Sequence, residues 1–69
     1  MKAGILTLSD KGARGEREDL SGAALRNWLE QRDVKTHAYE MIPDEETLIS
    51  AKLIEWADTG DLDIILTTG

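Results

Sequence analysis

The chain has 69 residues, a length that allows at most one domain. It contains no cysteine, which excludes disulfide bonds, thiolate metal sites and cysteine nucleophiles. The formal net charge of −6 disfavours binding to nucleic acid or to acidic membranes, although backbone N–H groups or Mg²⁺ can still hold a small phosphorylated ligand. There is no apolar run of the ~20 residues that a membrane span needs, and no signal peptide, so we expect a cytoplasmic soluble protein.

The first strand is predicted over residues 2–9, KAGILTLS. This segment is almost continuously apolar, a pattern typical of a strand buried on both faces of a parallel sheet. Residues 10–19 are polar and predict a loop with glycines at positions 12 and 15. Its basic residues, Lys11, Arg14 and Arg17, could reach a phosphate, but the acidic residues between them favour a solvated, mobile loop.

A helix is predicted from Leu20 onward, with Asp19 or Ser21 capping its first turn. Its apolar stripe consists of Ala24, Leu25, Trp28 and Leu29. The position of Trp28 on this stripe indicates a core or subunit-interface residue. No glycine closes the helix, and its stripe fades near residues 31–33.

Residues 34–42, VKTHAYEMI, predict a second strand that Pro43 ends. Polar and apolar residues alternate imperfectly along it, which favours a position near the edge of a sheet. His37 lies in the middle of this strand, and we interpret it as a surface residue and not a ligand. Since it is the only histidine, no Ser/His/Asp triad has support.

A second long helix is predicted to begin at Asp44 and to end at Gly60, because glycine tolerates the left-handed conformation of a helix end. Glu45 and Glu46 would complement the helix dipole in its first turn. As the N-cap, Asp44 would stabilise the helix by ~1 kcal/mol, and this role alone would account for it. The predicted buried stripe, which includes the second tryptophan, consists of Leu48, Ile49, Leu53, Trp56 and Ala57.

The last apolar run, residues 62–67, predicts a third strand. Strands that alternate with helices imply an α/β fold with a parallel sheet and right-handed crossovers. The strand order 2-1-3 would bring together the ends of the first and third strands, whereas the order 3-2-1 would separate them. Because no helix follows the third strand, we expect the natural domain to continue beyond Gly69.

In the order 2-1-3, a crevice opens between two short polar groups, Thr7, Ser9 and Asp10 on one side and Thr67, Thr68 and Gly69 on the other. Hydroxyls and a close-approaching backbone suit a phosphorylated ligand, and a carboxylate can hold Mg²⁺. From the residues alone, Ser9-Asp10 is more often an ordinary strand exit than a site, and Thr67-Thr68-Gly69 could likewise be a plain strand end. The chain has no GxxxxGK[ST] and no GxGxxG motif, which argues against the commonest nucleotide binders.

Four short motifs occur in order along the whole chain: Leu6-Thr7-Leu8-Ser9-Asp10, Asp19-Leu20-Ser21-Gly22, Ile42-Pro43-Asp44-Glu45 and Thr67-Thr68-Gly69. Together they closely resemble molybdenum-cofactor-biosynthesis proteins of the MoaB/Mog type. The resemblance implies a three-layer α/β/α fold, usually trimeric, of which residues 1–69 form the N-terminal βαβαβ portion. It also implies that the parent protein binds molybdopterin and, in one branch of the family, adenylylates it with ATP and Mg²⁺.

The resemblance also implies roles for individual residues. Asp44 matches a family carboxylate implicated in catalysis through metal or substrate positioning. Ser9 and Asp10 match the end of the first strand beside the site, and residues 67–69 match the start of a glycine-rich ligand loop. A second family aspartate lies in a segment that this chain lacks. The alternatives are a non-catalytic molybdopterin-binding or oligomerisation module, or an inactive fragment.

Overall fold

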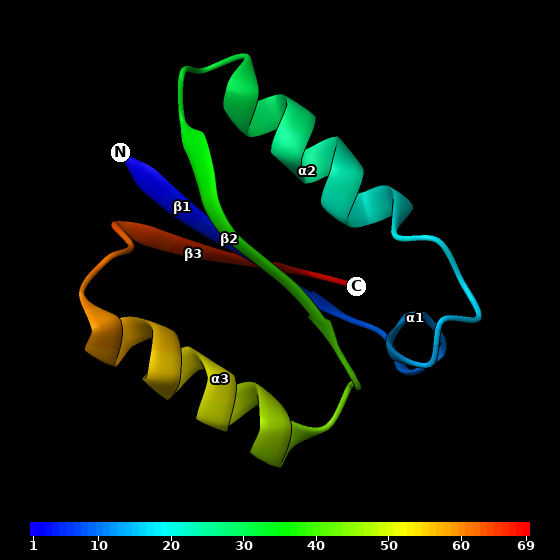
Figure 1. The fold of residues 1–69 in the computed structure, drawn as a ribbon. Helices are drawn as coiled ribbons and strands as arrows, with labels where there is room; N and C mark the ends of the chain where they lie inside the picture. The colour runs from blue at the N-terminus through cyan, green and yellow to red at the C-terminus, as the bar shows by residue number, and fades with distance from the viewer.

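The computed structural model describes residues 1–69 and contains a three-stranded sheet between two long helices (Figure 1). The strands are β1 (Lys2–Leu8), β2 (Lys35–Ile42) and β3 (Ile64–Thr68). All of them pair in parallel, in the order β2-β1-β3. The predicted order 2-1-3 is therefore confirmed, and the alternative 3-2-1 is excluded.

The two long helices, α2 (Leu20–Glu30) and α3 (Glu46–Thr59), cover opposite faces of the sheet. On one face, Leu29 of α2 packs against Ala3 and Ile5 of β1. On the other face, Trp56 of α3 packs against Leu6 of β1 and Ile42 of β2. Because successive strand residues point to opposite faces, a continuously apolar β1 serves both halves of this core.

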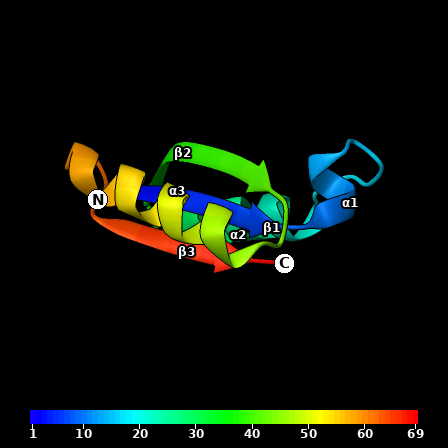
Figure 2. The same cartoon turned by 90° about the horizontal axis from the view of Figure 1, so that it is seen from below.

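The carboxyl ends of the three strands lie at one end of the molecule. Figure 2 shows the three arrowheads pointing the same way, toward the short helix α1 (Asp10–Ala13). A loop was predicted for residues 10–19. That prediction is wrong for residues 10–13, which are helical, whereas residues 14–19 are not helical. The physical reason is Ser9, which is extended and accepts a hydrogen bond from the Gly12 N–H at 3.1 Å. It thereby caps a single helical turn.

The start of α3 also differs from the prediction. The N-cap is Glu45, whose backbone is extended and whose side chain makes no capping hydrogen bond, while Asp44 lies one residue outside. The prediction that Asp44 caps this helix is therefore wrong. The Glu45 N–H bonds instead to the carbonyl of Pro43 at 2.8 Å, a tight turn that delays the first helical residue to Glu46.

The ends of both helices use the left-handed conformation. Gly60 closes α3 with φ 70°, as predicted. Asp33 follows α2 with φ 58°, and the Val34 N–H reaches back to the Leu29 carbonyl at 3.0 Å. Val34 also packs on the cluster that contains Leu29, so this turn has the bonding and the apolar contact of a Schellman motif. Aspartate here takes the place that glycine usually occupies.

The predicted apolar stripes are only partly buried. Trp56 is 9% exposed, but Trp28 is 49% and Leu48 41% exposed, and Ala57 is exposed as well. Trp28 is therefore not a core residue in this structure, and the subunit-interface alternative stays a prediction. The Arg32 guanidinium lies over the Trp28 ring, 3.8 Å from the ring centroid, in a cation–π contact. None of the helices is both long enough and apolar enough to cross a membrane.

Candidate functional site

A pocket of about 500 Å³ opens at the carboxyl ends of the strands. Thr7 and Ser9 at the end of β1 line it, together with Met41 of β2 and Gly69 after β3. Residues 17–21, at the start of α2, form a further part of its wall. Ligands bind at this edge of an open parallel sheet, where neighbouring crossovers leave in opposite directions.

Asp19 is the residue that ties the walls of this pocket together. Its carboxylate accepts hydrogen bonds from the Thr7 hydroxyl at 2.7 Å and from the Gly22 N–H at 2.9 Å. It also accepts a hydrogen bond from the hydroxyl of Tyr39. One side chain therefore links β1, β2 and the first turn of α2. The predicted cap is confirmed, but the links to the two strands were not predicted.

The surroundings of Asp19 and Tyr39 shift the pKa of both side chains. Burial raises the pKa of the Asp19 carboxyl, but the hydrogen bonds from Tyr39, Gly22, Thr7 and Ser21 together outweigh it, and its pKa falls below the ordinary value. Burial, and then the hydrogen bond to Asp19, raise the pKa of the Tyr39 hydroxyl. Asp19 is therefore a charged acceptor and Tyr39 a neutral donor at pH 7.

Three glycines lie where the pocket walls approach each other closely. A Cβ added to Gly22 would overlap the Asp19 carboxylate and lie 3.0 Å from the Thr7 hydroxyl oxygen. One added to Gly12 would overlap the Met41 sulfur, and one added to Gly69 would overlap the carbonyl oxygen of Leu8. At Gly69 the overlapping atom belongs to the backbone, whereas at Gly22 and Gly12 it belongs to a side chain that would have to move.

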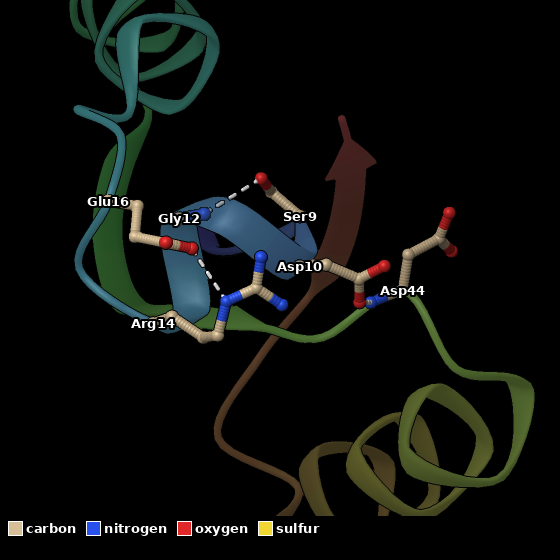
Figure 3. Close-up of polar contacts among 6 residues, drawn as sticks. All are labelled: Ser9, Asp10, Gly12, Arg14, Glu16 and Asp44. Atoms are coloured by element: carbon tan, nitrogen blue, oxygen red, sulfur yellow. Dashed lines mark hydrogen bonds and ion pairs between the residues drawn. The ribbon is translucent and has the colours of Figure 1, made fainter.

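Beside the pocket, the first residue of α1 is joined to the turn after β2 by a hydrogen bond. The Oδ1 atom of Asp10 accepts a hydrogen bond from the backbone N–H of Asp44 at 3.0 Å, across 34 residues of sequence. Figure 3 shows the Asp10 side chain reaching this nitrogen, while the Asp44 carboxylate extends away from α3. Both side chains are exposed. The bond fixes the turn after β2 against the start of α1.

The structure divides the predicted site residues into three groups. Ser9 and Gly69 line the pocket, and Asp10 and Asp44 are joined next to it by the bond from the Asp44 N–H to the Asp10 carboxylate. Thr67 and Thr68 lie instead along a second hollow, on the face of the sheet that α2 covers. Tyr39 was not singled out, and the only signal for it was its place in an alternating strand.

These groups suit an anionic, oxygen-rich ligand. The Ser9 hydroxyl and the Ser21 N–H offer donors, whereas the Leu20 and Gly22 N–H groups already donate to the Glu18 carbonyl and the Asp19 carboxylate. No cluster of three or more histidine, cysteine or acidic residues that could enclose a metal ion is present. A metal that keeps bonds to ligand phosphates and water needs only one or two carboxylates, and Asp10 and Asp44 are the exposed carboxylates at this end of the sheet that could supply them.

The sequence profile of a family described as a probable molybdopterin binding domain matches residues 4–69. The chain belongs to this molybdopterin-binding domain family. The predicted resemblance is thus confirmed, and the pocket at the carboxyl ends of the strands lies in a domain of that family.

Similar sequences include two proteins named molybdopterin adenylyltransferase and one molybdenum cofactor synthesis protein. A molybdopterin adenylyltransferase of Pyrococcus furiosus is 38% identical, and the match covers 99% of this chain and 39% of that protein. One of Helicobacter pylori is 38% identical over 96% of this chain and 39% of that protein. The Drosophila melanogaster molybdenum cofactor synthesis protein cinnamon is 36% identical over 96% of the chain and 11% of its own length.

Solved structures support the fold. The molybdopterin biosynthesis enzyme MoaB of Thermus thermophilus superposes with a TM-score of 0.90 at 48% identity, covering 99% of this chain and 43% of that one. The tungsten cofactor synthesizing protein MoaB of Pyrococcus furiosus gives 0.83 at 38% identity, covering 99% and 41%. The predicted α/β fold class is confirmed. The chain spans about two fifths of the length of these relatives.

Proposed function

We propose that the protein binds molybdopterin in the pocket at the carboxyl ends of the strands and adenylylates it with ATP and Mg²⁺. The observation that carries this proposal is the meeting, at one sheet edge, of the pocket with the Asp10–Asp44 pair. The names of the similar proteins support the choice of substrate and reaction. The predicted cytoplasmic location and homotrimer belong to the same proposal.

In this reaction, an oxygen of the molybdopterin phosphate attacks the α-phosphorus of ATP. The bond from that phosphorus to the bridging oxygen breaks, AMP is transferred and pyrophosphate leaves. Such a transfer needs positioning and stabilisation of negative charge more than covalent help from the protein. The roles of this chain are therefore to hold the phosphate near Ser9 and Gly69, and to place Asp44 beside it.

In this proposal the exposed carboxylates of Asp10 and Asp44 would hold Mg²⁺ together with the ligand phosphates. Hydrogen bonding to the Asp44 N–H uses one oxygen of Asp10, while the other oxygen of Asp10 and both oxygens of Asp44 remain exposed. Asp44 is the predicted catalytic and metal-holding residue, and Asp10 would support it. When bound, Mg²⁺ would offset the charge on the phosphates of ATP.

The test is molybdopterin-dependent release of pyrophosphate from ATP, measured on the wild type and on Asp44→Asn. Removing the Asp44 charge should lower kcat roughly 100-fold while molybdopterin affinity stays within a few-fold, because the lost contact acts on the reacting phosphates. Asp58→Asn, at an exposed acidic position near the end of α3, is the matched control and should retain wild-type turnover.

Three results would each overturn a different part of this proposal. A wild-type protein that binds molybdopterin but never consumes ATP would favour the non-catalytic binding or oligomerisation module. Full activity in Asp44→Asn would remove the assigned residue from catalysis. Failure to bind molybdopterin at all would favour the inactive fragment.

A further inference from the structure

The polypeptide between α1 and α2 places one basic residue at the pocket. Of the three basic residues at positions 11–17, Arg17 lines the pocket and the other two do not. Arg14 is directed elsewhere, since its Nε lies 2.6 Å from the Glu16 carboxylate (Figure 3). Arg17 forms no ion pair with another residue of the chain. Its charge is therefore available to a ligand.

Two acidic residues, Glu18 and Asp19, line the pocket beside Arg17, and they differ in how far hydrogen bonds compensate their charge. The Asp19 carboxylate is surrounded by donors from Thr7, Ser21, Gly22 and Tyr39, which compensate its charge internally. Glu18 lines the pocket as well and has no such partners. Arg17 thus faces one uncompensated carboxylate, in a chain whose net charge is −6.

Neutral donors converge on the same space. The Oγ atom of Ser9 accepts from the Gly12 N–H, so its own hydroxyl proton is free to donate into the pocket. The first turn of α2 adds the Ser21 N–H, since the N–H groups of Leu20 and Gly22 already donate to the Glu18 carbonyl and the Asp19 carboxylate. Phosphate is a ligand group that uses a guanidinium, a hydroxyl and a backbone N–H at once.

We propose that Arg17 is the residue that binds a phosphate group in this pocket. The inference rests on the proposed function, which supplies two sources of that group, the phosphate of molybdopterin and the phosphates of ATP. A guanidinium can donate two parallel hydrogen bonds to one phosphate, and it stays charged at any pH at which the protein folds. Glu18 opposes Arg17 by repelling the same anion.

The first experiment uses inorganic phosphate as the probe, with binding followed through the amide NMR signals of Ser9, Gly12, Ser21 and Gly69. In the wild type these signals should shift together and saturate. Arg17→Gln should weaken phosphate binding roughly 10- to 100-fold, because a charge-assisted contact is lost. Arg14→Gln makes the same charge change on the same segment away from the pocket and should leave the affinity within twofold.

The acidic neighbour supplies an effect of opposite sign. Glu18→Gln should tighten phosphate binding roughly threefold, since it removes an exposed like charge. Equal losses in Arg17→Gln and Arg14→Gln would overturn the proposal, because net charge alone would then explain both. Phosphate affinity that is unchanged in Arg17→Gln, or absence of the four amide shifts in the wild type, would also overturn it.

Repeating the titration with molybdopterin and with ATP identifies the source of the phosphate and separates this inference from the proposed function. A larger loss in Arg17→Gln for one of the two ligands assigns the subsite to that ligand. If the wild type binds phosphate through Arg17 but does not bind molybdopterin, the proposed function fails and the subsite stands. If molybdopterin and ATP bind equally to the wild type and to Arg17→Gln, only the subsite fails.

Discussion

Asp19 concentrates three structural roles in a single carboxylate. It caps α2 through the Gly22 N–H, holds the Thr7 hydroxyl at the end of β1 and accepts from Tyr39 on β2. These contacts need the ionised carboxylate as the acceptor and the protonated tyrosine as a donor. The geometry of the pocket should therefore depend on the protonation of both residues.

We predict that the free energy of unfolding falls at both ends of the pH range because of this pair. The pKa of Asp19 is lowered in the folded state, so its contribution is present above its unfolded pKa, roughly 3.9, and is lost as the pH falls through the folded value. The pKa of Tyr39 is raised, so its contribution is present below roughly pH 10 and is lost as the pH rises through the folded value.

Urea unfolding measured across the pH range tests this prediction. Asp19→Asn should flatten the acid limb, and Tyr39→Phe should flatten the alkaline limb while Asp19 still caps α2. Arg26 lies over the Tyr39 ring, 5.2 Å from its centroid, and its charge lowers the pKa of Tyr39, so Arg26→Gln keeps both hydrogen-bonding partners and serves as the control for the acid limb. Acid and alkaline limbs that are identical in all variants would contradict the assigned roles.

At the scale of elements, α2 and α3 are both followed by a residue in the left-handed conformation, but the residue type differs. Each ends in a left-handed residue, Asp33 after α2 and Gly60 after α3. A side chain in this conformation crowds the backbone, and aspartate tolerates it better than most residues. The glycine was therefore readable as a helix end, whereas the aspartate was not.

Gly60→Ala should lower the free energy of unfolding by about 1 kcal/mol, because alanine is strained at φ 70°. Gly60→Asn is the matched variant and should cost less, since asparagine adopts this conformation more readily. Urea unfolding with unchanged m-values would measure both effects. A Gly60→Ala variant as stable as the wild type would show that the turn after α3 rearranges without cost.

At the scale of the whole molecule, the core is small. Of the 69 residues, 9 are buried, and Trp28, Leu48 and Ile54 remain at least 41% exposed. Both β2 and β3 have one strand neighbour each, so each also presents an unpaired edge. Unpaired edges and exposed apolar side chains favour association.

The polypeptide of residues 1–69 by itself should consequently self-associate. Sedimentation equilibrium should give a mass above 7.6 kDa that increases with concentration. Trp28→Lys should reduce this mass, because it places a charge in the hollow that Trp28 lines with Leu66 and Thr68. A concentration-independent monomer with a cooperative unfolding transition would show that these residues form a self-sufficient unit.

Local patterns correctly predicted the elements that chain-local physics determines. The period of the apolar residues placed all three strands and both long helices, with ends that differ by at most two residues. Asp19 and Gly60 were recognised at helix ends because their roles depend on neighbouring backbone groups. The loop prediction missed α1, since a single capped turn has no apolar period to reveal it.

The sequence by itself determined the alternation of strands and helices, the parallel sheet and the family resemblance, because each follows from side-chain spacing or short motifs. Only the tertiary structure decided the strand order, the pairing of Asp10 with Asp44 and the convergence of Thr7, Asp19 and Tyr39. These contacts join residues from 12 to 34 positions apart. The spacing of neighbouring residues does not predict contacts over such sequence separations. Those contacts form only when the crossover helices pack on the sheet and bring the strand ends together.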